Sequence, residues 1–511
     1  SVNLYHNANQ KLSTTSSGIL VTGSVQANAL SAAATYTSII YGGSSALQLK
    51  GNTGEMFAEF NNDGNAELYY DNVKKFETTS TGIDVTGSVV ADGLTVDGGT
   101  VKLDGDFPTG SRNVALGDEA LNGVSGGSYN VAIGSETLKN LTSGSNNTAV
   151  GRAAAQLRTT GNSNISIGSV SMYNTTTGST NTAVGHNSLY TNTTGAGNVA
   201  LGYQSLYYNT TASYTVAIGE NALLQNTTGF GNVAVGAFSL DSNTTAGGNT
   251  AVGYASLSTT QTGYDNTAVG KDALKLNTNN ANTAVGAYAL DANTTAGSNT
   301  AVGYIALGAT TTGSHNTAVG IQALENNTTG IFNVAIGREA LKVNTTSINN
   351  IAIGYSAARN SNVNNLVAIG YEAMLSTTSG GDNTAIGYHS LRTNTTGTSN
   401  TALGNSALFT NATGTDNTAL GKQALYTNSS GHRNTAIGIS SLYSSTTAND
   451  NVAMGRDSLY NNTTGSTNTA IGYNASKNQT TASGNTTLGY QAQWQVSTGG
   501  NNTAIGKEAS K

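Results

Sequence analysis

Aliphatic, small and polar residues follow one another in a fixed order along most of the chain. From Asn113 onward, a unit reading roughly N-T-A-V-G-x-x-A-L-x-x-N-T-T-G-x-x recurs in twenty-four copies, each with a glycine that ends its N-T-A-V-G run. Successive glycines are seventeen residues apart, except at two steps of sixteen, Gly270 to Gly286 and Gly354 to Gly370. A period held this tightly predicts one closed turn of backbone per unit, stacked on its neighbours.

The unit fits β-strands better than a helix. Numbered from its asparagine, it has aliphatic residues at positions 4 and 9 and glycine at position 5, which matches no 3.6-residue stripe. In T-A-V, positions 2 and 4 share one face and position 3 points the other way, and the flanking Asn and Gly favour turns. We therefore expect two short strands with tight turns per unit. The resulting fold is all-β, a parallel β-solenoid of about 24 coils, on the order of 115 Å long at a strand spacing of ~4.8 Å.

The aliphatic positions predict the interior of this solenoid. Position 4 is aliphatic in all twenty-four copies, and position 9 is usually leucine. Burying such side chains is the main favourable term available to each coil. The residues expected in the core include Leu116, Ile133, Val150, Val252, Leu274, Val302, Leu324 and Ile386.

The alanine column predicts a contact between subunits. Position 3 is alanine in all but two copies, where Ser166 and Thr487 stand. An outward residue that is free to vary should vary, and a residue kept small lets another backbone approach closely. We interpret this column, with the small position 8, as a threefold subunit interface. The alternative is a narrow single-chain solenoid with room only for alanine inside. The interface candidates are Ala149, Ala183, Ala251, Ala301 and Ala318.

The N-terminal region has a different organisation. Residues 11–25 reappear, with substitutions, as residues 75–89, an offset of sixty-four. Short β-type runs alternate there with Gly, Asn and Ser, which predicts β-hairpins. The first module starts partway through, so we expect the sequence to be a piece of a longer product. The predicted domains are a β-rich shaft, 1–110, and the solenoid, 111–511, with Pro108 at the junction.

Asn-Thr-Ala-Val-Gly at 181–185 and Asn-Val-Ala-Ile-Gly at 333–337 resemble the N-x-(V/T)-A-I-G signature of YadA-like head repeats in trimeric autotransporter adhesins, and similar arrays in phage tail fibres. This resemblance covers roughly residues 110–511. It implies a homotrimer of left-handed parallel β-rolls that serves attachment to a cell surface. The family's coils are shorter than seventeen residues, which leaves handedness and cross-section open. The N-terminal modules also resemble shaft segments of marine phage tail fibres.

Composition narrows the class of protein. Only 9% of residues are charged, against about 25% in ordinary globular proteins. The net charge of −6 argues against a nucleic-acid binder, which needs clustered Lys and Arg. Without cysteine, neither disulfides nor thiolate metal sites are available. No apolar run approaches the ~20 residues of a membrane span.

The sequence offers little catalytic chemistry. Its five histidines occupy unrelated repeat positions, and no nucleophile elbow, P-loop or zinc spacing occurs in a suitable context. We therefore expect no catalytic residue, metal site or cofactor.

Two polar columns remain. The asparagine of position 1 is expected to stack into an amide ladder along the rod. The ladder candidates are Asn147, Asn181, Asn249, Asn299 and Asn316. Tyrosine recurs at position 6, where it either covers the adjacent turn or contacts a glycan. The tyrosines considered for a glycan are Tyr203, Tyr254, Tyr304 and Tyr388.

These features favour a non-enzymatic structural fibre outside the cell. Our leading hypothesis is a phage tail fibre or related appendage that attaches to a host cell. Its expected partners are two further copies of the chain, a host surface glycan or protein, and other virion or appendage proteins beyond both ends. The alternatives are a bacterial adhesin or filament built from the same repeat, and an ice- or glycan-binding solenoid.

Overall fold

The computed structural model describes residues 3–6, 9–15, 18–21, 37–42, 46–51, 54–61, 64–80, 82–87, 112–495 and 497–510. The chain divides into two compact units, Ser1–Lys102 and Leu103–Lys511. The predicted boundary at 110/111 and Pro108 lie outside the described residues. Every helix or strand assigned within the described ranges is a β-strand, which confirms the all-β class.

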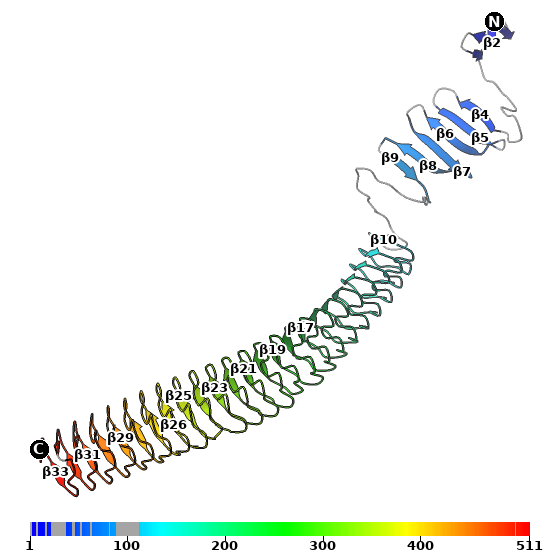
Figure 1. Cartoon of the computed structure of the whole chain (residues 1–511). Helices are drawn as coiled ribbons and strands as arrows, with labels where there is room; N and C mark the ends of the chain where they lie inside the picture. Colours follow the sequence, from blue (N-terminus) through cyan, green and yellow to red (C-terminus); the bar gives the residue numbers. More distant parts are fainter. Residues whose placement is uncertain are drawn as a thin grey trace. The chain divides into compact units, whose positions relative to one another are not determined.

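The first unit contains antiparallel hairpins (Figure 1), as its alternating pattern predicted. One sheet has the order β1-β2-β3 and the other the order β4-β5-β6-β7-β8-β9, with each strand paired antiparallel to the next. The strands are β1 Asn3–His6, β2 Asn9–Thr15, β3 Gly18–Val21, β4 Thr37–Gly42, β5 Ala46–Gly51, β6 Met56–Asn61, β7 Ala66–Tyr70, β8 Val73–Thr79 and β9 Gly82–Val85.

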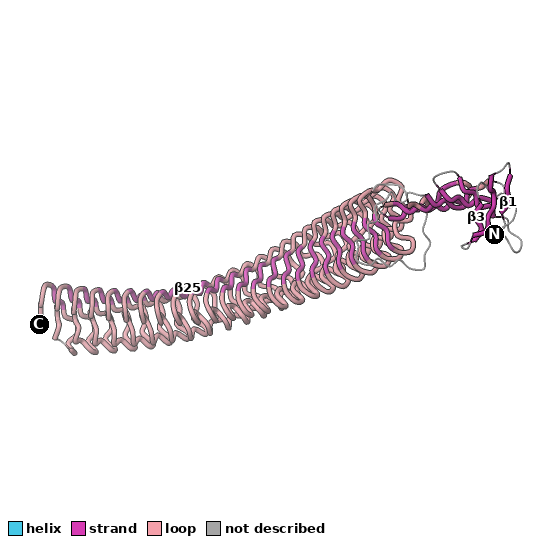
Figure 2. The backbone as a smooth tube through the Cα atoms, turned by 90° about the horizontal axis from the view of Figure 1, so that it is seen from above, coloured by secondary structure: helices cyan, strands magenta, loops and turns pink. Residues whose placement is uncertain are grey.

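The second unit is a parallel β-solenoid, and this confirms the predicted fold. Twenty-four strands of three residues pair in chain order in one sheet. They lie along one side of the coils (Figure 2). The strands are β10 Val114–Leu116, β11 Val131–Ile133, β12 Thr148–Val150, β13 Ile165–Ile167, β14 Thr182–Val184, β15 Val199–Leu201, β16 Val216–Ile218, β17 Val233–Val235, β18 Thr250–Val252, β19 Thr267–Val269, β20 Thr283–Val285, β21 Thr300–Val302, β22 Thr317–Val319, β23 Val334–Ile336, β24 Ile351–Ile353, β25 Val367–Ile369, β26 Thr384–Ile386, β27 Thr401–Leu403, β28 Thr418–Leu420, β29 Thr435–Ile437, β30 Val452–Met454, β31 Thr469–Ile471, β32 Thr486–Leu488 and β33 Thr503–Ile505.

The register follows the glycine period, including the two short coils. Positions 2, 3 and 4 pair with the same positions of the next coil, and the sixteen-residue steps keep this pairing. The missing residue is absorbed in the corner at positions 13–15. In the second short coil, the Asn362 side-chain Oδ1 accepts from the Thr345 backbone N at 3.0 Å. That bond normally goes to the position-13 carbonyl of the next coil. A side-chain amide therefore replaces the missing backbone contact, and the strand row stays in register.

Each described coil contains one strand rather than the two we expected. After the position-5 glycine, the chain forms turns in which positions 7 and 9 have positive φ. Leu274 and Leu324, at position 9, both have a φ of 51°. Left-handed geometry costs roughly 1–2 kcal/mol for a residue with a side chain. Hydrogen bonds to the next coil, such as Leu274 N to the Ala289 carbonyl at 3.0 Å, hold the turns in place.

The buried residues show that our prediction of which strand face points inward was wrong. Positions 2 and 4 do share one face, but that face is the outer one. Leu116, Ile133, Val252 and Val302 leave 36–46% of their surface exposed, and Val150 and Ile386 are half-buried. Within this set of predicted core residues, only the position-9 leucines Leu274 and Leu324 are fully buried.

The predicted alanine interface is wrong for the same reason. Ala149, Ala183, Ala251, Ala301 and Ala318 are all fully buried within their own chain. They form one core cluster with the position-9 leucines. The interior between the strand and the turn that carries the position-9 leucine is narrow. Because this leucine already fills it, only a methyl group fits from the strand side. The single-chain solenoid with an alanine interior, our alternative, describes this arrangement.

Two columns of buried asparagine join successive coils. At position 1, the Asn147, Asn181, Asn249, Asn299 and Asn316 side chains each accept a hydrogen bond from the next position-1 backbone N, at 2.9–3.1 Å. At position 12, a second column forms amide-to-amide bonds, for instance from Asn209 Nδ2 to Asn192 Oδ1 at 2.9 Å. Both columns lie inside the coil. The repeat's second asparagine was the available signal for the position-12 column, which sequence reasoning missed.

Replacing Asn316 with alanine should destabilise the rod locally by about 1–3 kcal/mol. Its Oδ1 accepts from Asn333 N at 3.0 Å, and its Nδ2 donates to the Gly330 carbonyl at 2.8 Å. Without the amide, the buried Asn333 N loses its acceptor, at about 1–3 kcal/mol, whereas the Gly330 carbonyl keeps a hydrogen bond from Asn327 Nδ2 at 3.1 Å. Hydrogen exchange of the flanking coils measures the change. Asn326→Ala, at an exposed position, is the control and should stay within about 0.5 kcal/mol.

Arg158 places a buried cation at position 12, in a part of the rod where the neighbouring coils have Leu141 and Thr175 at this position and the asparagine column has not yet begun. Its Nη1 donates to the Gly178 carbonyl at 2.8 Å, Nη2 contacts the Met172 sulfur at 3.3 Å, and Nε has no partner. Burial lowers the pKa of the guanidinium to about 9. Because this lies below the pKa in an unfolded chain, the buried charge costs stability below pH 9, and the cost falls as the pH rises above 9.

Arg158→Asn should therefore stabilise the protein at neutral pH. The substitution removes the buried charge and restores the residue found at position 12 in most coils, which we expect to be worth about 1–3 kcal/mol. The midpoint of urea unfolding should rise for this variant. The matched control is Arg152→Asn, at an exposed position 6, and its midpoint should not move. A lower midpoint for Arg158→Asn would show that its two hydrogen bonds outweigh the cost of burial.

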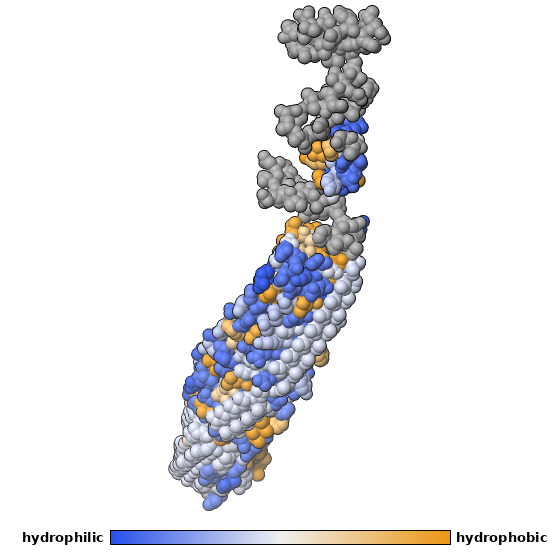
Figure 3. All heavy atoms as spheres, turned by 90° about the vertical axis from the view of Figure 1, so that its right-hand side faces the viewer, coloured by the Kyte–Doolittle hydropathy of each residue, from blue (hydrophilic) through white to orange (hydrophobic). Residues whose placement is uncertain are grey.

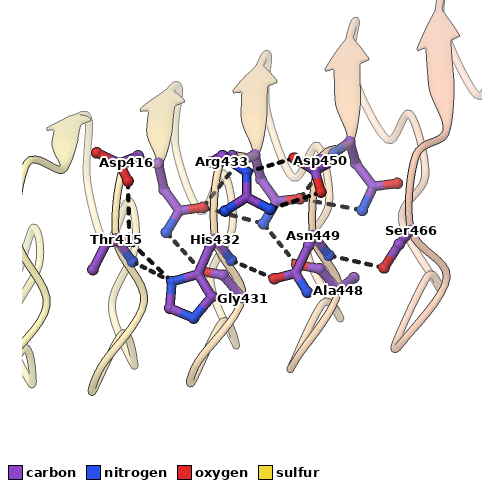
Figure 4. Close-up of polar contacts among 12 residues, drawn as sticks. Thr415, Asp416, Gly431, His432, Arg433, Ala448, Asn449, Asp450 and Ser466 are labelled. Atoms are coloured by element: carbon purple, nitrogen blue, oxygen red, sulfur yellow. Dashed lines mark hydrogen bonds and ion pairs between the residues drawn. The ribbon is translucent and has the colours of Figure 1, made fainter.

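A third polar column runs along the corner at position 16 (Figure 4). Where position 16 is polar, its side chain commonly accepts from the position-16 backbone N of the coil before it. Thr415 N donates to His432 Nδ1 at 3.0 Å, His432 N to Asn449 Oδ1 at 2.7 Å, and Asn449 N to Ser466 Oγ at 3.0 Å. His432 thus has the same structural role as serine or asparagine in other coils.

Candidate assembly face

The outer side of the strand row is an uncharged face that runs the length of the solenoid. Position 2 is Val, Ile or Thr in every strand from β10 to β33, and position 4 is Val, Ile, Leu or Met. No charged residue occurs at these forty-eight positions. We call this surface, positions 2 and 4 of every coil, the strand face.

The strand face is partly open to solvent. Position-2 side chains such as Thr300 are half-buried. Position-4 side chains are exposed or nearly so, from Val252 at 36% to Leu488 at 45% and Ile505 at 66%. The buried part of each of these side chains lies against the same positions of the neighbouring coils, as expected for in-register parallel pairing. The other half has no cover within the described chain.

The area of the strand face is large for a free surface. Twenty-four strands at ~4.8 Å spacing, each about 10 Å long, present on the order of 1,100 Å². Thirty-four of its forty-eight positions are aliphatic and fourteen are threonine. The aliphatic part, roughly 800 Å², is above the about 300–600 Å² of the largest apolar patches on soluble monomers, and the whole face exceeds the roughly 800 Å² per partner of a stable interface. The strand face therefore has the dimensions of an interface.

The remaining rod surface is polar but weakly charged. Much of it in Figure 3 is coloured between the hydrophilic and hydrophobic extremes. Thr, Ser and Gly occupy many corner positions, and position-13 threonines such as Thr210 and Thr227 donate to carbonyls of the next coil at 2.9–3.0 Å. A shallow groove of about 550 Å³ lies over this corner. It is lined by Thr191, Tyr208, Thr210, Gln225, Thr227 and Thr244.

The structure does not bring the four tyrosines considered for glycan contact together. Tyr203, Tyr254, Tyr304 and Tyr388 leave 48–53% of their surface exposed, and consecutive members are three or more coils apart. Each ring also contacts an aromatic neighbour. Tyr388 stacks on Tyr371 with centroids 5.3 Å apart, and Tyr203 stacks on His186 at 5.7 Å. These tyrosines cover adjacent turns and form no shared pocket.

The described residues contain no group of three or more His, Asp or Glu side chains placed to hold a metal ion. Nor do they contain a helix long and apolar enough to cross a membrane. The ionisable residues mostly form ion pairs along the rod, such as Arg433 with Asp450 at 2.7 Å (Figure 4). This guanidinium lowers the pKa of the Asp450 carboxyl.

No family model, curated protein or solved structure matches this chain. The resemblance to YadA-like head repeats therefore stays a prediction carried by the N-T-A-V-G motif. The strand face rests on the geometry alone.

Proposed function

We propose that the chain is a non-enzymatic structural fibre, a rod of three identical subunits joined through their strand faces. The observation that supports this most is the uncharged strand face along all twenty-four coils. A second copy has the same spacing along its own rod, so aliphatic rows of two copies can interlock over their whole length. A partner without this period would meet the face at only a few points.

The proposed trimer differs from the predicted one in its contact surface. The alanine columns lie inside the coils, so the position-4 aliphatic side chains, with position 2, take their place between subunits. Burying side chains that are about 40% exposed contributes on the order of 25 cal/mol per Å² removed from water. Spread over twenty-four coils, this gain can balance the cost of bringing three chains together.

The biological role we propose is attachment of a phage tail fibre, or a related appendage, to a host cell surface. Identical coils give reach and stiffness, while the variable positions 6, 7, 10 and 11 present many copies of a surface to a receptor. Weak contacts repeated along one rod gain strength through avidity. A bacterial adhesin or filament built from the same rod is the alternative.

The mass in solution tests the assembly, and a binding assay tests the role. Light scattering should give three times 51.6 kDa for the trimer, and a mass of one chain would refute it. Fluorescently labelled protein should then bind host cells and be competed by unlabelled protein. The variant with charged strand faces introduced in the Discussion is the control for avidity.

Ice binding is a second candidate function, because the strand face carries rows of threonine at position 2. Threonine occupies this position in β18 to β22 without interruption, which gives hydroxyl groups at a regular spacing. A trimer would cover these hydroxyls, so the two functions exclude each other on this face. Thermal hysteresis in a solution of the single-chain form would support ice binding, and normal freezing would exclude it.

A further inference from the structure

In the six-stranded sheet β4–β9 of the N-terminal unit, strands β5 to β9 have two faces of opposite character. One row of directly paired residues crosses five strands and is polar: Gln48, Glu59, Glu67, Glu77 and Asp84. Like charges placed directly opposite one another destabilise a sheet, so four neighbouring carboxylates need solvent and donors. This row marks the polar face of the sheet.

The polar face supplies those donors itself. Gln48 Nε2 donates to Glu59 Oε1 at 2.7 Å, and Asn65 Nδ2 donates to Glu77 Oε1 at 2.9 Å. Lys74 forms ion pairs with both Glu77, at 2.5 Å, and Glu67, at 3.4 Å. The Tyr69 hydroxyl also donates to Glu67, and this hydrogen bond raises the pKa of Tyr69 to about 12. Glu59, Glu67 and Glu77 thus have donors within the sheet, and Asp84 is exposed to solvent.

The opposite face is apolar. The row next to the carboxylates crosses the same five strands, and a shorter row lies beyond it. Because side chains alternate along a strand, both rows project away from the polar face. Of their ten residues only Thr78 is polar. The rows are Leu49, Ala58, Leu68, Phe76 and Val85, then Leu47, Phe60 and Ala66 with the pair Thr78 and Ile83. We call these ten residues the apolar sheet face.

The apolar sheet face is uncovered within the described chain. Phe60, Leu68 and Ile83 leave 43%, 47% and 65% of their surface exposed, and of the ten residues only Ala58 is buried. Figure 3 shows hydrophobic and hydrophilic side chains gathered on opposite sides of this sheet. A folded domain needs at least two layers to bury an apolar face, and the exposure of these side chains shows that no described segment acts as a second layer here.

We infer that the second layer comes from the same sheet in other copies of the chain, with the apolar sheet faces packed together and the carboxylate rows turned to solvent. Every copy then covers its apolar face and keeps its polar face wet. A partner of another kind would have to bring an uncharged face of matching width. A second copy of the chain has such a face because its sequence is the same.

The size of the apolar sheet face shows when this contact can form. Five strands at ~4.8 Å spacing and about 17 Å long give on the order of 400 Å² per chain, half of the roughly 800 Å² per partner in a stable complex. The contact is therefore too small to assemble chains alone. It rests on the proposed fibre, whose rod holds the three N-terminal units at a high effective concentration.

Cysteine cross-linking tests the inference, because the chain has no cysteine of its own. Ile83 and Asp84 are neighbours in β9, are both exposed, and project to opposite faces. In the full chain, Ile83→Cys treated with a short bis-maleimide should give linked pairs of chains on a denaturing gel. Leu68→Cys, at the centre of the apolar sheet face, should do the same. Asp84→Cys should remain single chains.

Parallel measurements separate the possible failures. Equal linkage from Ile83→Cys and Asp84→Cys, or linkage from neither while light scattering gives three chains, would refute the sheet contact and leave the rod proposal intact. A single-chain mass would refute both. If Leu68→Cys fails to link and also resists a monofunctional maleimide, another segment or another protein covers the face, which again overturns the inference.

Discussion

Replacing Val252, Val285 and Val302 with glutamate should reduce the mass in solution from the three chains of the proposed trimer to one. All three side chains are exposed at position 4 of the strand face, at 36–38% of their surface. In a trimer each would be buried against a partner that offers only aliphatic and threonine side chains. A buried carboxylate without a partner costs several kcal/mol, and three chains would place nine of them in one interface.

The control for this experiment adds the same charge elsewhere on the rod. Ala237→Glu, Ala287→Glu and Ile321→Glu change position 6, which follows the corner glycine and lies outside the strand face. This variant should keep the three-chain mass by light scattering. Circular dichroism should be the same for both triple variants, because neither touches the interior. If the position-4 variant also keeps three chains, the strand face is not the interface.

Replacing Gly303 with alanine should strongly destabilise the coils around it. Gly303 has a φ of +139°, and a Cβ there would lie 2.4 Å from the Gly320 carbonyl oxygen. Backbone of the next coil cannot yield without breaking the strand register. We expect a local loss of about 4–5 kcal/mol, the upper end for single substitutions. Amide hydrogens in the coils beside residue 303 should then exchange roughly a thousandfold faster.

Gly381→Ala is the matched control for that experiment. Gly381 has no positive φ, and a methyl group added there would have the Asn364 carbonyl oxygen as its nearest neighbour, at 3.3 Å. Its substitution should change local exchange by less than tenfold. Because each coil contacts only its neighbours, the effect of Gly303→Ala should also fade within a few coils. Uniform acceleration along the rod would instead show that the solenoid unfolds as one unit.

The sequence was sufficient for the features that depend on order along the chain. The glycine spacing predicted the parallel register, and the alternation in T-A-V predicted that Thr300 and Val302 share a face opposite Ala301. It was not sufficient to say which face is inner. That depends on the width of the coil, which is set by the path of positions 6 to 17. The turn with left-handed residues such as Leu307 brings the position-9 leucine close to the strand, and only alanine then fits at position 3 of the strand.

For the same reason, the candidate assembly face could be predicted from the sequence only in part. The uncharged character of positions 2 and 4 is visible in the sequence, but we assigned position 4 to the core because aliphatic residues are usually buried. The position-12 asparagines were visible too, as part of N-T-T-G. We interpreted them as turn residues because burying an amide costs free energy unless it is hydrogen-bonded. Their hydrogen-bond partner lies seventeen residues away, in the next coil.

The left-handed leucines have a consequence for how the rod forms. A coil on its own would carry the strain of positions 7 and 9 without the hydrogen bonds that hold them, so no coil is a stable nucleus. Each coil must therefore fold against a coil that is already formed. Folding should propagate one coil at a time from the place where the first few coils have packed together.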